Sequence, residues 1–128
     1  MKLFSDADRE MVISRLRNTR EALLITFHNA HGPTALSRLW SDFMADIGLS
    51  GKCISWWSGT GNIGLIECEN EDGPSIYGQW VLSDQTRLVS VIELDREDLV
   101  AIRDGFETGN VTSSVMRTIR IGETFDRD

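Results

Sequence analysis

The sequence contains few of the residues that constrain a chain by a ring or a crosslink. Only two of its 128 residues are proline and two are cysteine. A proline-rich linker is therefore excluded, because it needs many more prolines. Hydrophobic residues form 41% of the chain and charged residues 26%. This composition predicts one packed globular domain over residues 1–128, with a frayed tail at about 122–128.

The sequence also lacks a long apolar run. No stretch reaches the roughly 18 apolar residues of a membrane span. The N-terminus turns acidic at Asp6, where a signal peptide would turn apolar. Cys53 and Cys68 fit two packed thiols in a reducing compartment, although adjacent strands could also bring them together. We therefore expect a cytoplasmic protein, with the pairing of the cysteines left open.

Basic residues are fewer than acidic ones. Thirteen Lys and Arg stand against twenty Asp and Glu, which gives a formal net charge of −7 at pH 7. Such a chain repels nucleic-acid phosphates and anionic membrane surfaces. We therefore expect no direct binding to nucleic acid or membrane, and we expect a protein partner to present a basic surface.

Helical patterns dominate the first third of the chain. Ser5 with Asp8 predicts a helix cap, and apolar residues at helical spacing extend the expected helix over about 6–29. Its second half, 22–28, is short and apolar enough to be a buried strand instead. A second helix is predicted over 34–47, where apolar residues repeat every three and four positions.

Strand patterns follow over 52–57, 63–69, 75–82 and 86–94. Their short, turn-rich links favour an antiparallel meander, since parallel strands need crossovers of about a dozen residues. A third helix is predicted to begin at Asp95, and the segment 111–121 fits either a closing strand or a helix. The predicted class is α+β, an antiparallel meander sheet of four to five strands packed against two or three helices.

Two motifs suggest a bound group but lack its context. Residues 59–64 match the G-x-G-x-x-G pattern and follow a predicted strand, yet the next segment, 65–69, predicts a strand where a dinucleotide site needs a helix. A hairpin turn is the preferred interpretation. His28 and His31 have the spacing of two metal ligands, but no third ligand is marked nearby. We therefore assign no cofactor, no metal and no catalytic residue.

The predicted sheet carries apolar residues on both faces. Successive strand residues point to opposite faces, and each strand has large side chains at both positions of the alternation. The expected helices cover one face, so the second face meets either the rest of the chain or another protein. The apolar anchors predicted on this second face are Trp57, chosen over Trp56, with Leu65, Tyr77, Val81, Val89 and Val91. The acidic residues predicted to frame them are Glu67, Glu69, Glu71 and Asp72.

These patterns favour a protein-binding protein. The leading hypothesis is an inhibitor, immunity-type or anti-defence protein, often a homodimer, that occludes a partner's functional surface with anchors around Trp57 and Tyr77. If that surface normally holds nucleic acid, the acidic frame would compete as a partial phosphate mimic. Two alternatives stay open. One is a small-ligand sensor with a closed pocket between the sheet and the second helix, and the other is a small enzyme that places His28 or His31 near Cys53 or a carboxylate.

Overall fold

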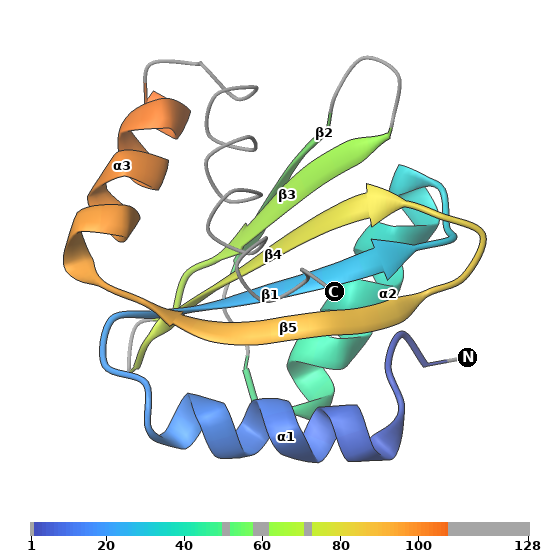
Figure 1. Cartoon of the computed structure of the whole chain (residues 1–128), viewed down its shortest axis with the longest axis horizontal. Helices are drawn as coiled ribbons and strands as arrows, with labels where there is room; N and C mark the ends of the chain where they lie inside the picture. The colour runs from blue at the N-terminus through green and yellow to red at the C-terminus, as the bar shows by residue number, and fades with distance from the viewer. Residues whose placement is uncertain (1, 50–51, 58–61, 71–72, 108–128) are drawn as a thin grey trace.

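A computed structural model of the protein describes residues 2–49, 52–57, 62–70 and 73–107 (Figure 1). The helices are α1 (Asp6–Arg17), α2 (Pro33–Asp46) and α3 (Arg96–Glu107). The strands are β1 (Ala22–Asn29), β2 (Cys53–Trp57), β3 (Ile63–Cys68), β4 (Ser75–Leu82) and β5 (Arg87–Leu94). Three helices and an open five-stranded sheet confirm the predicted α+β class for this part of the chain.

The sheet is mixed rather than wholly antiparallel. Its strand order is β2-β3-β4-β1-β5, and β2, β3 and β4 form the predicted antiparallel meander. Strand β1 lies between β4 and β5, parallel to β4 and antiparallel to β5 (Figure 1). The prediction of an antiparallel meander throughout is therefore wrong. The connection from β1 to β4 contains α2, β2 and β3, which is long enough for a parallel pair.

The first helix is shorter than its apolar periodicity suggests. Ser5 caps α1 as predicted, because its Oγ accepts a hydrogen bond from the Asp8 backbone N–H at 3.2 Å. The helix ends at Arg17, where the next side chain, Asn18, donates to the carbonyl of Ser14 at 3.1 Å. The predicted helix over 6–29 is therefore wrong beyond this point.

Strand β1 takes the place of the second half of that helix. All six residues from 22 to 27 are buried, which is the pattern of a central strand covered on both faces. A helix of the same sequence would bury one stripe only. The alternative of a buried strand over 22–28 is confirmed.

Helices α1 and α2 pack together on the first face of the sheet (Figure 1). The predicted stripe of α2 forms much of this core, and Trp40 stacks on Phe27 with ring centroids 5.9 Å apart. Large buried side chains of this kind each contribute about 1.5–3 kcal/mol to folding. The core consists of Leu3, Phe4, Val12, Leu23, Ile25, Phe27, Leu36, Trp40, Phe43, Met44, Ile66, Cys68, Ile76, Trp80 and Val91.

Helix α3 covers part of the second face. It begins directly after β5, and the Oδ1 of Asp95 accepts a hydrogen bond from the Asp98 N–H at 2.8 Å, which confirms the predicted cap. Helix α3 follows β5 at the end of the sheet where β1 begins (Figure 1). Leu99 of α3 packs into a second core. That core consists of Ala22, Leu24, Leu65, Tyr77, Ile92, Leu94 and Leu99. The chain therefore shelters a large part of both sheet faces by itself.

Cys53 and Cys68 form a disulfide between directly paired residues of β2 and β3. The indole Nε1 of Trp40 donates to Cys68 Sγ at 2.9 Å. This replaces the expected pair of packed thiols. Disulfides are typical of oxidising compartments, so the cytoplasmic location stays a prediction. Among the described residues, no helix has the length and apolar character that crossing a membrane requires.

Some predictions fall on residues outside the described ranges. They are the centre of the glycine motif at 59–61, the acidic residues Glu71 and Asp72, the segment 111–121 and the tail at 122–128.

Candidate functional site

Strand register divides the second sheet face into rows that cross β4, β1 and β5. The apolar row contains Tyr77, Leu24 and Ile92. The polar row contains Gln79, Thr26 and Ser90. The end row, where β1 and β4 finish, contains Val81, His28 and Arg87. The face therefore changes from an apolar interior to a polar middle and then to an exposed end.

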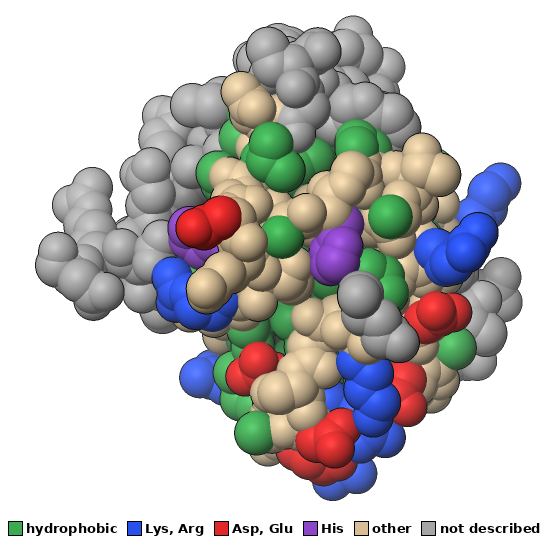
Figure 2. Space-filling view, turned by 90° about the vertical axis from the view of Figure 1, so that its right-hand side faces the viewer, with side chains coloured by type: hydrophobic (Ala, Val, Ile, Leu, Met, Phe, Trp, Pro, Cys, Tyr) green, Lys and Arg blue, Asp and Glu red, His purple; other side chains and the backbone are tan. Residues whose placement is uncertain are grey.

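The exposed end carries the end patch, which consists of Ile63, Val81 and His28 on the second face and of Leu82, the residue after Val81, on the opposite face. Val81 and Leu82 are 36% and 46% exposed. Because consecutive strand residues point to opposite faces, β4 is uncovered on both sides at its end. Figure 2 shows hydrophobic side chains and the histidines over the upper half of this end, with an acidic side chain beside one histidine, basic side chains at the right edge and most of the charged side chains below.

Asn29 fixes the loop that presents His31. Its buried side chain donates to the His31 carbonyl at 2.8 Å and accepts from the His31 N–H at 3.0 Å. The Asn29 carbonyl also accepts from the Ser83 N–H at 2.9 Å, and Thr86 Oγ1 accepts from the Ala30 N–H at 3.1 Å. These bonds join the loops after β1 and β4. Sequence reasoning missed Asn29, although an asparagine before a Gly-Pro pair is a usual turn signal.

Three oxygens of the polar row are buried without a hydrogen-bond partner. Thr26 Oγ1, Gln79 Oε1 and Ser90 Oγ make no hydrogen bond within the part of the chain that the structure describes. The three residues are 6%, 2% and 8% exposed. Each such group costs about 1–3 kcal/mol, which an apolar side chain of similar shape avoids. Sequence reasoning also missed this row, because only the strand register brings its members together.

Two of the predicted anchors are interior residues. Leu65 and Tyr77 share the second face with Val81, as predicted, but both are fully buried within the chain. They belong to the core that Leu99 of α3 covers. The prediction that they meet a partner is therefore wrong for this structure, and Val81 is the exposed member of the three.

A β-bulge moves Val91 to the first face. The pairing of β1 with β5 shifts between Thr26 and Phe27, where β5 has one extra residue, Val89. An extra residue reverses the alternation beyond it. Val91 therefore lies in the first-face core at 5% exposed, and Ile92 takes the second-face position. Val89 is half-buried, so neither valine is a fully exposed anchor as predicted.

The strand register also tests the prediction that Trp57, and not Trp56, lies on the second face. Trp56 pairs with the second-face residue Leu65, whereas Trp57 pairs with Gly64. The pairing therefore groups Trp56 with the second-face positions, contrary to the choice of Trp57. The side chains of both tryptophans lie outside the described part of the structure.

The acidic residues that were predicted to frame the apolar anchors do not surround Val81. Glu67 is 6% exposed because its position belongs to the covered second face, and Glu69 is exposed. Both lie near the start of β4, whereas Val81 lies near its end. Glu71 and Asp72 are outside the described residues.

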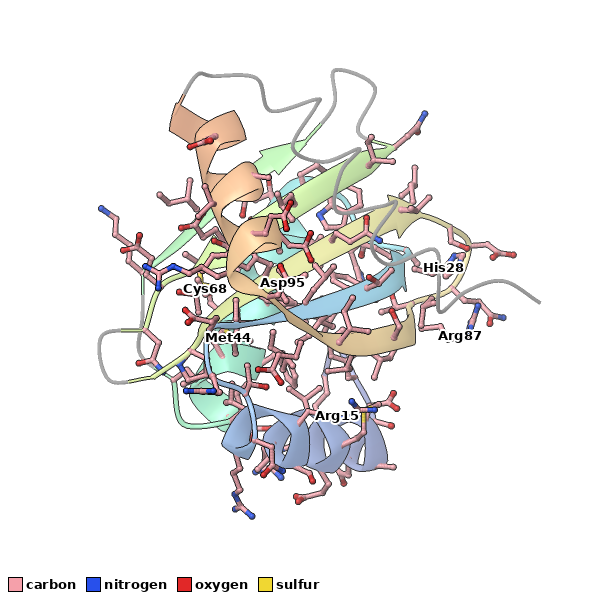
Figure 3. The ribbon with its side chains drawn as sticks, turned by 60° about the vertical axis from the view of Figure 1, so that its left-hand side comes forward. Arg15, His28, Met44, Cys68, Arg87 and Asp95 are labelled. Carbon is pink, nitrogen blue, oxygen red and sulfur yellow. A yellow bond between two sulfur atoms is a disulfide. The ribbon has the colours of Figure 1, made fainter. Side chains whose placement is uncertain are left out.

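The cysteine and histidine side chains do not form a catalytic pair. Cys53 is bonded to Cys68, so it supplies no thiolate nucleophile. His28 lies with Arg87 at one end of the sheet, away from Cys68 (Figure 3). Among the described residues, no cluster of three or more His, Cys, Asp or Glu could hold a metal ion. The alternative of an enzyme with His28 or His31 near Cys53 therefore lacks a free thiol in this structure, and the version with a carboxylate stays a prediction.

The strands beside the glycine motif are paired as a hairpin. Strand β3 begins at Ile63, within the motif, and it pairs antiparallel with β2. A strand and not a helix therefore follows the loop, as predicted. This arrangement lacks the helix N-terminus that a dinucleotide pyrophosphate needs.

A small hollow between the N-terminus and α2 is lined by Lys2, Leu3, Phe4, Arg9, Leu39, Asp42, Phe43 and Asp46. Its volume of about 210 Å³ is below the roughly 300–1,000 Å³ of typical ligand pockets. Its charges are largely paired. Arg9 Nε donates to Asp46 at 2.6 Å, and Lys2 Nζ donates to Asp6 at 2.9 Å. The hydrogen bond between Lys2 and Asp6 and the attraction between their charges lower the pKa of Asp6 and raise the pKa of Lys2.

No protein-family model matches the sequence, and neither a curated protein nor a solved structure matches the chain.

Proposed function

We propose that the protein is a small acidic protein-binding protein and that it contacts its partner through the end patch. The observation that carries this proposal is the exposure of two consecutive apolar residues, Val81 and Leu82, beside His28. Scattered apolar residues are ordinary on protein surfaces. Here the register places Val81 directly between Ile63 and His28 on the second face, and Leu82 continues the exposed apolar surface around the end of β4 on the opposite face.

The backbone around the end patch favours binding. The hydrogen bonds of Asn29 hold the loop that carries His31, and Thr86 joins the neighbouring loop to it. A surface that is ordered before binding loses less conformational entropy when the partner docks. The apolar side chains then contribute the area that is removed from water.

The charge of the chain favours a basic partner. A formal net charge of −7 accelerates encounter with a positively charged protein and opposes nucleic acid. In this proposal the protein acts by occlusion, as an inhibitor, immunity-type or anti-defence protein does, and the end patch replaces the predicted anchors around Trp57 and Tyr77. A second copy of the chain is the other partner that an exposed patch of this kind suits.

A pair of matched surface variants tests the proposal. The double variant Val81→Asp/Leu82→Asp charges the end patch, and Val100→Asp charges an exposed apolar residue of α3, 50% exposed, outside the patch. Each tagged protein is crosslinked in the cells that express it naturally, and captured proteins are quantified. We expect wild type and Val100→Asp to retain the same partner, and the double variant to lose it by at least about tenfold.

The mass of the purified protein in solution shows whether the partner is a second copy of the same chain. A wild-type dimer that the double variant converts to a monomer would make the partner another copy of this chain. Retention of the same partner by the double variant, with its fold intact by circular dichroism, would contradict the proposal.

A further inference from the structure

The polar row is built like a binding site for a small molecule. Gln79, Thr26 and Ser90 come from three adjacent strands, and the register places them side by side. Each residue is more than nine-tenths buried, and each has a side-chain oxygen without a hydrogen-bond partner among the described residues. Buried polar groups in folded proteins nearly always have a partner. Three unpartnered oxygens in neighbouring positions therefore indicate that something outside the described residues completes them.

The surroundings of the row define an apolar side and an open side. Toward the start of β1, the neighbouring second-face residues Leu24 and Ile92 are buried and apolar. Toward its end, Val81 is exposed and His28 is half-buried. A molecule that enters past the end patch would therefore meet the polar row first and the apolar residues beyond it.

The donor and acceptor groups of the row restrict the chemistry of that molecule. The oxygen of Gln79 can only accept, so the ligand must supply an N–H or O–H donor to it. The hydroxyls of Thr26 and Ser90 can donate or accept. The row carries no charge, and the acidic residue Glu67 occupies the same face. A charged ligand would leave an unpaired buried ion beside the row, and an anion would also meet this carboxyl group.

We propose that the polar row binds a small uncharged molecule that has an amide or hydroxyl head and an apolar body. The head bonds to Gln79, Thr26 and Ser90, and the body packs against Leu24 and Ile92. This proposal rests on the buried oxygens, so it is independent of whether the end patch binds a protein.

Three probes that share one ring and differ in the head test this chemistry on the full-length oxidised protein. Benzamide has the required donor and acceptor, benzoate has the same shape with a charge, and toluene has no polar head. Two-dimensional amide NMR follows each titration. We expect benzamide to cause saturable shifts centred on positions 26, 79 and 90, and benzoate and toluene to cause none there.

Two near-isosteric variants assign the effect to the row. Thr26→Val and Ser90→Ala each remove one hydroxyl, and each should weaken benzamide binding by about 2- to 10-fold, the value of one neutral hydrogen bond. Val100→Ala on α3 is the matched control and should bind as wild type does. The amide spectrum without probe verifies the fold of each variant. The proposal would be overturned if benzamide caused no shifts or shifts centred elsewhere, or if benzoate or toluene caused the same shifts. It would also be overturned if both hydroxyl variants bound benzamide with the affinity of wild type.

Discussion

The indole of Trp40 lies where a side chain at Gly78 would be. A Cβ at position 78 would approach Trp40 Cη2 to 2.4 Å, and a Cβ at Gly64 would approach Trp80 Cζ2 to 2.3 Å. Both distances are far below a van der Waals contact. Two glycines on the first face therefore allow two tryptophans to lie directly on the sheet.

We predict that Gly78→Ala destabilises the protein by about 1–3 kcal/mol, because the added methyl group overpacks the core beneath Trp40. Urea denaturation followed by tryptophan fluorescence measures the change. Gly32→Ala is the control, since a Cβ at Gly32 has no atom within 4 Å. An equal and small effect of both substitutions would show that Trp40 does not occupy this position.

We predict that the disulfide contributes about 2–4 kcal/mol to stability. Cys53 and Cys68 are 15 residues apart, and closing a loop of about this length removes conformational entropy from the unfolded chain. Urea denaturation of wild type and Cys53→Ala under oxidising conditions measures the difference. Alkylation followed by mass spectrometry determines the state of the thiols. Alkylation of both cysteines without a reductant would contradict the disulfide between Cys53 and Cys68.

We predict that Asp6 titrates below its ordinary pKa of 3.8 and Lys2 above its ordinary pKa of 10.5, because each stabilises the charged form of the other. The stabilisation through Asp6 is present above the unfolded pKa and is lost as pH falls through the lowered folded value. The stabilisation through Lys2 is present below 10.5 and is lost as pH rises through the raised folded value.

The carboxyl carbon of Asp6, followed by NMR across the acidic range, measures this shift. Lys2→Met should return the pKa of Asp6 toward its ordinary value, and Lys2→Arg should largely preserve the shift. An unchanged pKa of Asp6 in Lys2→Met would exclude Lys2 as the cause.

The elements with local signals were predictable from the sequence. The stripe of α2 places Leu36, Trp40 and Phe43 in the core as its spacing indicates, and Gly48 adopts the positive φ of 85° expected just after this helix. The caps at Ser5 and Asp95 were predictable for the same reason, since a cap depends on residues three positions apart.

The features that depend on distant residues were not predictable from the sequence. Strand β1 is central in the sheet, so its continuous apolar run does not distinguish a buried strand from a helix. The extra residue in β5, Val89, reverses the expected faces of Val91 and Ile92, and nothing in the local sequence marks the bulge.

The candidate site was predictable only in part, because some of its features depend on residues that are distant in the sequence. Val81 was assigned to the second face correctly, because β4 is a regular strand. The exposure of Leu65 and Tyr77 was predicted wrongly, because it depends on where α3 packs. The polar row needs the register of three strands, which a single sequence does not specify.

In the ligand-free protein, the oxygens of the polar row are buried without partners among the described residues. The unfolding free energy of Thr26→Val tests this claim most directly. Replacing an unpartnered buried hydroxyl by a methyl group of the same shape removes a desolvation cost. Urea denaturation of the ligand-free protein should therefore show an increase of about 1 kcal/mol relative to wild type. A decrease of about 1 kcal/mol or more would show that the hydroxyl of Thr26 is hydrogen-bonded within the chain and would contradict the account.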